Sequence, residues 1–247
     1  MRISVQPPTY RWKGVIVAFC ILIAWSSLML VALTAPTVPF WFILAAVPLL
    51  TFLYVGLFIT AHDSMHGLVA PSHPHINRGI GALAVNLYAL FSFDLLLAEH
   101  KRHHNQPGSS SDPDFHREAH SSFLAWYFHF MLHYVTIWQL VKIAVVVNTL
   151  TYFGGVETER ILTFFALPAL LSSLQLFFFG TYLPHRRTGE AFKDRHNARS
   201  SAFAEWFSFI SCYHFGYHWE HHEYPFVPWW GLPAVRRLNP SEHTISG

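Results

Sequence analysis

The stretch FWFILAAVPLLTFLYVGLFITAHDSMH, residues 40–66, is uncharged until its last five residues, His62-Asp-Ser-Met-His66. An apolar run of about 20 residues is long enough to cross roughly 30 Å of hydrocarbon as a helix. A similar run, VIVAFCILIAWSSLMLVALTA at residues 15–35, precedes it, and the short gap between them leaves no room for a domain. We therefore expect two membrane-spanning helices, the second of which carries histidines where it leaves the membrane.

Further apolar runs extend this pattern along the chain. Residues 123–150 and 161–183 predict two more spans, whereas the run at 203–215 is too short to cross and is expected to lie at the membrane interface. Residues 79–98 are apolar but interrupted by glycines and polar residues, which favours a helical hairpin that is re-entrant or interfacial. The sequence thus predicts an all-α integral membrane protein with about four transmembrane helices and this hairpin, forming one domain over residues 1–247.

Composition and charge agree with a membrane protein. Of the 247 residues, 52% are hydrophobic and only 12% are charged. Fourteen of the sixteen Lys and Arg residues fall in segments 1–14, 62–122 and 184–247, which share one face if the chain crosses four times. Such a bias predicts that these segments, including the N-terminal segment 1–14, are cytoplasmic. A net charge of +2 without a basic tract argues against nucleic acid, and two cysteines inside apolar runs argue against a disulfide framework.

Three histidine clusters fall on this predicted cytoplasmic face. They are His62-Asp-Ser-Met-His66, His100-Lys-Arg-His103-His104 and His218-Trp-Glu-His221-His222. Spacings of three and four residues place side chains on one stripe of a helix, so each cluster can direct its imidazoles at a common point. Eight imidazoles exceed what one ion accepts, so we expect a histidine-rich cap that holds two metals. Imidazole suits Zn, Cu, Fe and Ni, so the ligand type leaves the metal open.

Other polar residues near the clusters are secondary candidates. His185 closes the fourth predicted span and could be a ninth ligand. Several side chains could hydrogen-bond to the ligand imidazoles and fix their orientation. They are Asp63, Asp112, Asp114, His214, Glu220 and Glu223. For Asp112 and Asp114, which follow the second cluster, an ordinary solvated loop is nearly as good an explanation. No role is assigned to His73, His75, His116, His120, His196 and His243.

The phrases around the clusters resemble the bacterial β-carotene ketolases, within the membrane fatty acid hydroxylase and desaturase superfamily. The resemblance covers most of the chain from about residue 52 and is strongest in LFITAHDSMHG, HKRHHNQPGSSSDPDF, SSLQLFFFGTYLPHR and CYHFGYHWEHHEYPFVPWWGLP. The clusters alone indicate only the superfamily. The Asp-Pro-Asp after the second cluster, and the Glu-Tyr-Pro and Trp-Trp after the third, narrow the resemblance to the ketolases.

The resemblance implies a non-haem di-iron centre with O₂ as co-substrate. The resemblance implies ligand and catalytic roles for the eight cluster histidines, His62, His66, His100, His103, His104, His218, His221 and His222. The ligand role is extended to His185, because related membrane oxygenases take one more histidine from a helix end. The implied reaction oxidises the C4 methylene of a β-ionone ring to a ketone by successive hydroxylation and dehydration. It would convert β-carotene to echinenone and canthaxanthin, and zeaxanthin to astaxanthin.

The resemblance and the sequence together indicate the partners of the protein and its location. The chain has no Gly-x-Gly-x-x-Gly fingerprint for a flavin or nicotinamide, so we expect an external reductant, a ferredoxin that docks on the basic cytoplasmic face. The carotenoid is expected to enter from the bilayer of the bacterial inner (cytoplasmic) membrane, along a tunnel of aromatic residues. Candidates for that lining are Phe91, Phe93, Trp126, Tyr127, Phe177, Phe178, Tyr182, Phe215, Tyr217 and Trp219.

Two other functions stay open from the residues alone. One is a fatty-acyl or alkane hydroxylase or a desaturase of the same superfamily, with the same iron and a different substrate. The other is a histidine-rich membrane metal transporter or sensor. Transporter sites usually lie near the bilayer midplane between half-helices, whereas these clusters are predicted beyond the helix ends.

Overall fold

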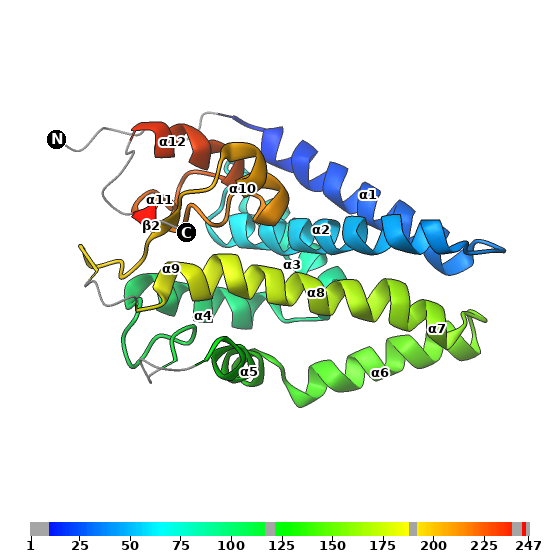
Figure 1. Cartoon of the computed structure of the whole chain (residues 1–247). Helices are drawn as coiled ribbons and strands as arrows, with labels where there is room; N and C mark the ends of the chain where they lie inside the picture. The colour runs from blue at the N-terminus through cyan, green and yellow to red at the C-terminus, as the bar shows by residue number, and fades with distance from the viewer. Residues whose placement is uncertain (1–9, 117–121, 188–191, 239–243, 246–247) are drawn as a thin grey trace.

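A computed structural model describes residues 10–116, 122–187, 192–238 and 244–245. These residues are predominantly helical, and the strands among them, β1 (Ser200–Ser201) and β2 (Thr244–Ile245), are two residues long and pair in parallel. Figure 1 shows long helices running side by side, with short helices and loops gathered at one end. The predicted all-α fold class is confirmed.

Helices α1 (Lys13–Thr34) and α2 (Phe40–Met65) are both long and apolar enough to cross a membrane, as predicted. They pack against each other through large side chains, with the Trp25 ring edge-on to the Tyr54 ring at 5.4 Å between centroids. Tyr54 and its neighbours in α2 are fully buried, so α2 is the central helix of the bundle. Its last turn holds His62, which places the first histidine cluster at the end of the most buried helix.

The predicted hairpin is present and is longer than residues 79–98. It comprises α3 (Pro74–Ala89) and α4 (Phe93–Asn105), which are bent by 100° at Leu90, a residue in the left-handed region with φ 59°. Asn77 fastens α3 to the end of α2. Its amide nitrogen donates to Ser64 O at 2.7 Å, and its amide oxygen accepts from the backbone of Val69 and Ala70 at 3.1 and 3.2 Å. These bonds shape the turn after the first histidine cluster.

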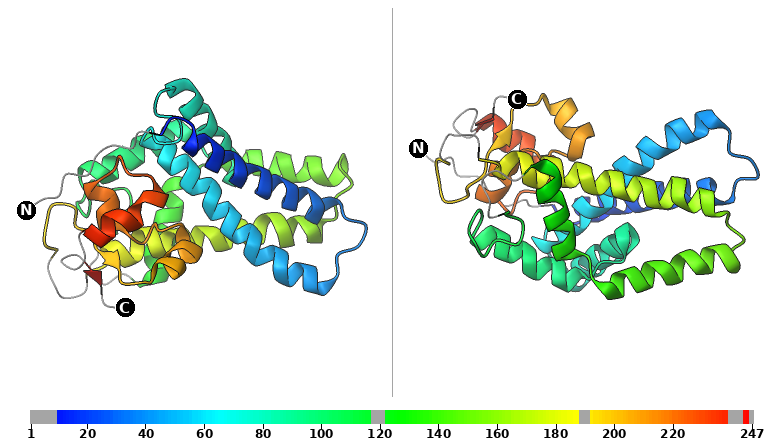
Figure 2. Two further views of the ribbon diagram at one scale, coloured as in Figure 1. Left: turned by 90° about the horizontal axis from the view of Figure 1, so that it is seen from above. Right: turned by 60° about the horizontal axis from the view of Figure 1, so that its bottom comes forward.

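The span predicted over residues 123–150 is not one continuous helix. The structure divides it into α5 (Phe123–Tyr134) and α6 (Ile137–Tyr152), bent by 84°, and Figure 2 shows α5 lying across the direction of the long helices. The break comes at Val135, which is extended, and at Thr136, whose hydroxyl accepts from Gln139 N at 3.2 Å and caps α6. An uncharged run shows that a segment is apolar, but it does not show where the helix changes direction.

The fourth predicted span, 161–183, is confirmed as part of a continuous helical run from Thr158 to His185. The run comprises α7 (Thr158–Arg160), the π-helical turn η1 (Ile161–Ala166), α8 (Leu167–Phe177), a second π-helical turn η2 (Phe178–Tyr182) and α9 (Leu183–His185). Among the described residues, α1, α2 and this run are each long and apolar enough to cross a membrane, and up to five spans result if each bent pair, α3 with α4 and α5 with α6, is one span. The prediction of about four spans falls within this range.

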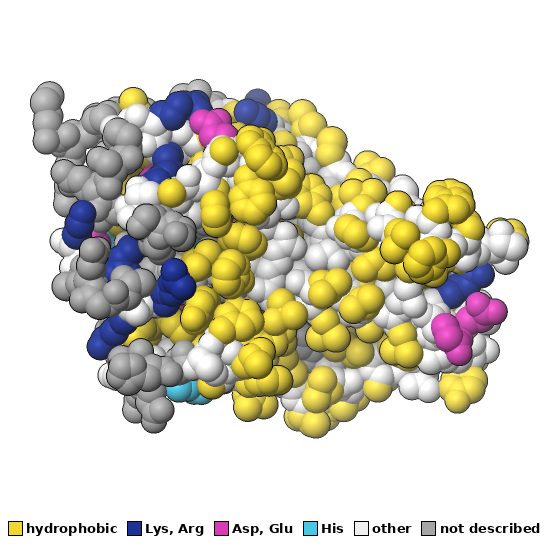
Figure 3. Space-filling model, viewed as in Figure 1, with side chains coloured by type: hydrophobic (Ala, Val, Ile, Leu, Met, Phe, Trp, Pro, Cys, Tyr) yellow, Lys and Arg dark blue, Asp and Glu magenta, His cyan; other side chains and the backbone are white. Residues whose placement is uncertain are grey.

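The chain then folds over the histidine end of the bundle. The covering elements are α10 (Glu205–Cys212), α11 (His218–Glu223), the 3₁₀ turn η3 (Trp229–Gly231) and α12 (Leu232–Leu238). In the view of Figure 3, hydrophobic side chains spread over the long helices, whereas most of the visible Lys and Arg side chains gather at the covered end. This distribution agrees with a bundle embedded in lipid and a basic cap beside it.

Two glycines of α3 provide a test of the packing against α2. A Cβ at Gly81 would overlap Ser64 Oγ and lie 2.6 Å from the Phe93 ring, whereas a Cβ at Gly79 would meet nothing within 4 Å. We expect Gly81→Ala to destabilise the fold by about 1–3 kcal/mol through overpacking. Gly79→Ala should be neutral or slightly stabilising because alanine favours helix. Thermal midpoints of the two proteins in one detergent check this, and equal midpoints would contradict the close α2–α3 contact.

Candidate metal centre

Nine histidine side chains converge where the ends of α2, α4, α9 and α11 meet. They form two groups, in each of which the candidate ligand atoms lie within 4.8 Å of one another. The first, called here the five-histidine group, comprises His62, His66, His100, His104 and His221. The second, the four-histidine group, comprises His103, His185, His218 and His222. All eight histidines of the sequence clusters, and His185, are therefore brought together.

In the five-histidine group the Nε2 atoms face one another. His62 Nε2 and His104 Nε2 lie 3.1 and 2.9 Å from His221 Nε2, and His66 Nε2 lies 2.7 Å from His100 Nε2. Each cluster of the sequence contributes to this group, because His62 and His66 come from the end of α2, His100 and His104 from α4, and His221 from α11. Several imidazole nitrogens pointed at one small volume are the arrangement that a bound cation requires.

The four-histidine group has the same character. His222 Nε2 lies 3.1 Å from His103 Nε2 and 3.0 Å from His218 Nε2. The His185 ring is edge-on to the rings of His103 and His218, at 4.9 Å between centroids in both cases. His185 Nε2 is buried without a hydrogen-bond partner among the described residues. Burying such an atom unpaired is unfavourable, so its position beside the other three imidazoles fits a metal ligand.

The electrostatics also suit a metal centre. Burial lowers the pKa of His218, His221 and His222 well below the usual value for histidine, and the neighbouring imidazoles lower it further. These side chains are therefore neutral, which is the form of imidazole that binds metal. Two nitrogen-only donor sets, the four-histidine group buried and the five-histidine group partly buried, fit two transition-metal ions, and iron is among the metals that imidazole suits.

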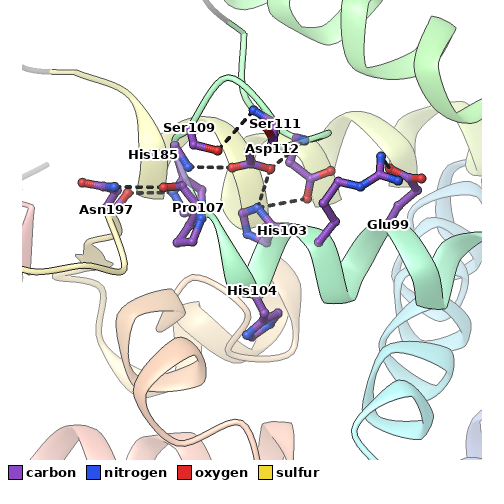
Figure 4. A network of polar contacts seen from close by, with 12 residues as sticks. Glu99, His103, His104, Pro107, Ser109, Ser111, Asp112, His185 and Asn197 are labelled. Atoms are coloured by element: carbon purple, nitrogen blue, oxygen red, sulfur yellow. Dashed lines mark hydrogen bonds and ion pairs between the residues drawn. The ribbon is translucent and has the colours of Figure 1, made fainter.

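Asp112 supports the centre directly. His103 Nδ1 donates to Asp112 Oδ1 at 2.9 Å, which leaves His103 Nε2 free to face the other imidazoles (Figure 4). The backbone N–H of Gly108 donates to Asp112 Oδ2 at 2.7 Å. Burial opposes ionisation of Asp112, but its contacts with His103 outweigh this effect and hold its pKa below the usual value. The carboxylate thus fixes both the tautomer and the orientation of this imidazole.

Asp63 and Asp114 lie near ligand imidazoles but are held mainly by other groups. Asp63 Oδ1 is 3.6 Å from His62 Nδ1, longer than a hydrogen bond, and Asp63 Oδ2 accepts from Trp229 N at 3.2 Å. Asp114 Oδ2 is 3.7 Å from His103 Nδ1, and its other oxygen accepts a hydrogen bond from the Tyr134 hydroxyl. Both side chains therefore fasten neighbouring segments beside the centre.

Glu220 was expected to fix the orientation of a ligand imidazole, but it supports the centre by anchoring a helix. Its carboxylate is fully buried and is paired with Arg236 at 2.8 Å on one oxygen, while the other accepts from the Ser200 hydroxyl. Ser200 Oγ in turn accepts from Trp219 N at 3.0 Å. Glu220 thus anchors helix α11, which carries three of the nine histidines, to β1 and α12.

The remaining candidates differ in their distance from the centre. The His214 ring lies among aromatic side chains, nearly parallel to the Tyr217 ring at 5.6 Å, and belongs to neither group of ligands. Glu223 Oε2 accepts from His196 Nε2 at 2.8 Å, and the His196 ring lies 5.8 Å from the His222 ring. His196 is buried behind the four-histidine group, although the sequence assigned it no role. It lies in a polar loop without periodic spacing, so no sequence pattern marked it.

A cavity of about 480 Å³ reaches the histidines from the interior of the bundle. His62, His100, His103 and His218 line one end of it. It extends along one face of the Thr158–His185 helix, where both Thr158 and Thr181 line it, a separation of roughly 35 Å at 1.5 Å per residue. Its walls are mainly apolar side chains of this helix and of α6, such as Leu170, Ile143 and Val147. Of the ten aromatic candidates, Phe91, Phe177 and Phe215 line the cavity.

The helical bundle and its histidine clusters define a membrane protein of the fatty acid desaturase class, and the family model described as "Fatty acid desaturase" matches residues 134–242. Closer relatives narrow this class. The chain is 46% identical to a protein named "Beta-carotene ketolase" from Paracoccus sp. (strain PC1), over 76% of each chain. It is 42% identical to another "Beta-carotene ketolase", from Paracoccus sp. (strain N81106 / MBIC 01143), over 90% of this chain and 92% of that one.

A third relative, "Beta-carotene 4-ketolase" from Protosiphon botryoides, is 42% identical over 76% of this chain, which spans 50% of that protein's length. On these similarities, the chain belongs to the β-carotene ketolase family.

The buried Glu220–Arg236 pair gives a prediction for stability. Glu220→Gln leaves Arg236 without its charged partner in a largely buried position, so we expect a loss of about 3–5 kcal/mol. The matched control is Glu205→Gln, because Glu205 pairs with Arg237 at the surface, where both side chains are more than half exposed. An exposed pair contributes at most about 1 kcal/mol. Thermal midpoints measure the difference, and similar shifts for both variants would contradict the anchoring role of Glu220.

Proposed function

We propose that this protein is an O₂-dependent di-iron oxygenase that converts the C4 methylene of a β-ionone ring to a ketone. Its substrate would be β-carotene, giving echinenone and canthaxanthin, with zeaxanthin as a further substrate that gives astaxanthin. One observation carries the proposal: two groups of buried or half-buried imidazoles lie at the end of a long apolar cavity, in a chain of the β-carotene ketolase family.

The proposed ligands are the nine histidines of the two groups. Bound iron would supply the activation of O₂. Neutral imidazoles such as those of His218, His221 and His222 can bind the ions without first losing a proton. Asp112 keeps His103 in the orientation that ligation needs. The surrounding protein also shields the centre, because six of the nine histidines are buried, including His62, His185 and His222.

The proposed reaction is two successive hydroxylations at C4, followed by loss of water from the resulting gem-diol. In sum, a methylene, two O₂, four electrons and four protons give a ketone and three water molecules. The C4 position is allylic to the polyene, so its C–H bond is weaker than that of an ordinary methylene. The apolar cavity would hold the polyene and keep water away from it, while its histidine-lined end would receive only the ring.

Four electrons must come from outside the protein, because the sequence has no flavin or nicotinamide fingerprint. We propose a ferredoxin as the donor and the cytoplasmic side of the bacterial inner membrane as the side on which it docks. Exposed basic side chains near the histidine end offer a complementary surface for an acidic carrier. They include Lys101, Arg102, Arg187, Lys193 and Arg195.

Pigment analysis tests the proposal. In cells that accumulate β-carotene, the protein is expected to produce echinenone and canthaxanthin, His221→Ala to produce neither, and His75→Ala to match the unaltered protein because His75 is exposed. Absence of ketocarotenoids, while an active ketolase in the same host makes both, would contradict the proposed substrate and leave a hydroxylase or desaturase acting on another lipid. The purified protein should hold about two irons per chain. Stoichiometric zinc without O₂ consumption would instead support a binding or transport role.

The cavity gives a second prediction. Ala169 lines it, whereas Leu171, two residues further along α8, does not and is 38% exposed. Ala169→Phe would place an aromatic ring in the path of the polyene, so we expect at least a tenfold loss of ketone formation, equivalent to about 1.4 kcal/mol. Leu171→Phe should leave the rate close to that of the unaltered protein. Iron content should be unchanged in both variants, and equal rates would show that the substrate does not occupy this cavity.

A further inference from the structure

Two loops support the four-histidine group from outside, and they meet at Asn197. His185 Nδ1 donates to the backbone oxygen of Asn197 at 2.7 Å. The side-chain amide of Asn197 donates to the backbone oxygen of Pro107 at 2.8 Å. Pro107 precedes the loop residue Asp112, which holds His103. Asn197 therefore joins the supports of two histidines that come from different helices (Figure 4).

The backbone of Asn197 is adapted to this double contact. Its φ of 44° is in the left-handed region, which asparagine adopts more readily than most residues other than glycine. Gly108 packs closely beside it, since a Cβ at Gly108 would lie 3.1 Å from Asn197 Cβ. The loop is held against α9 on its other side, where Arg199 N donates to Pro184 O at 3.1 Å. Asn197 is thus fixed between the end of the Thr158–His185 helix and the loop after α4.

The hydrogen bond from His185 Nδ1 has a chemical consequence. When Nδ1 carries the proton, Nε2 carries the lone pair, and His185 Nε2 is the buried atom beside His103 and His218. The Asn197 carbonyl therefore selects the tautomer that can bind a metal. The five-histidine group takes its members from α2, α4 and α11 and not from the helix that Asn197 holds.

We propose that Asn197 is a positioning residue that is selective for the four-histidine site. It sets the tautomer of His185 through its backbone, and it sets the placement of His185 relative to His103 through its side chain. Its loss weakens metal binding at this site and spares the five-histidine site. This proposal rests on the proposed function, because it takes both groups to be metal sites.

Two substitutions separate the contributions of the backbone and the side chain. Asn197→Gly keeps access to the left-handed conformation, and hence the carbonyl contact with His185, but removes the bond to Pro107. Asn197→Ala removes the same bond and also strains the backbone. Loss of an outer contact of a metal ligand typically weakens affinity 10- to 100-fold. We therefore expect faster release of one metal to a chelator, about tenfold for Asn197→Gly and closer to 100-fold for Asn197→Ala.

The measurement is metal content and release rate of the purified, detergent-solubilised full chain loaded with Fe(II), with Co(II) as a spectroscopic probe. Asn148→Ala is the matched control, because the Asn148 amide donates to Ala144 O at 2.7 Å on an exposed part of α6. It should retain both metals at the rate of the unaltered protein. In a His185→Ala background, Asn197→Gly should cause no further loss, since both changes act on the same ligand.

The outcomes distinguish the two proposals. An unaltered protein that binds fewer than two metals contradicts the proposed function. An unaltered protein with two metals, together with Asn197 variants that release both at its own rate, contradicts the role of Asn197 alone. Parallel loss of both metals in Asn197→Gly would overturn the selectivity for the four-histidine site. A further loss in the His185→Ala background would overturn the route through His185.

Discussion

The convergence of nine imidazoles in a small, largely buried volume is the constraint on which the rest of the structure depends. Nitrogen atoms about 3 Å apart, such as those of His62 and His221, require that α2, α4, α9 and α11 end at the same level. Much of the hydrogen bonding at this end of the bundle serves that requirement. Asn77 shapes the turn after α2, and Glu220 with Arg236 fixes α11. The long apolar helices carry the ligands to their place, and the polar contacts hold them there.

Much of the fold could be predicted from the sequence, because an uncharged run of about 20 residues has few structural meanings. This was sufficient for α1, α2 and the Thr158–His185 helix. It was not sufficient for residues 123–150, where the break at Val135 and Thr136 has neither proline nor glycine to mark it. The direction of a helix depends on what it packs against, and hydropathy does not record such contacts.

The site shows the same division between local and long-range information. The three clusters could be recognised because their spacing is local, and Asp112 was a candidate because it follows the second cluster closely. His196 and Asn197 belong to a polar loop that lies far in sequence from most of the residues they support. Glu220 could be listed from its place beside His221, but its partner Arg236 is known only from the packing of α12.

The shape of the cavity has a consequence for the order of events in catalysis. Its histidine-lined end is at one extremity of a passage roughly 35 Å long, so a stiff, two-ended molecule can offer only one ring at a time. If such a molecule is the substrate, as proposed, its second ring would reach the histidines only after the molecule withdraws, reverses and enters again, in competition with molecules not yet modified. The enzyme would then work distributively, and the ratio of singly to doubly modified product would follow the concentration of substrate in the membrane.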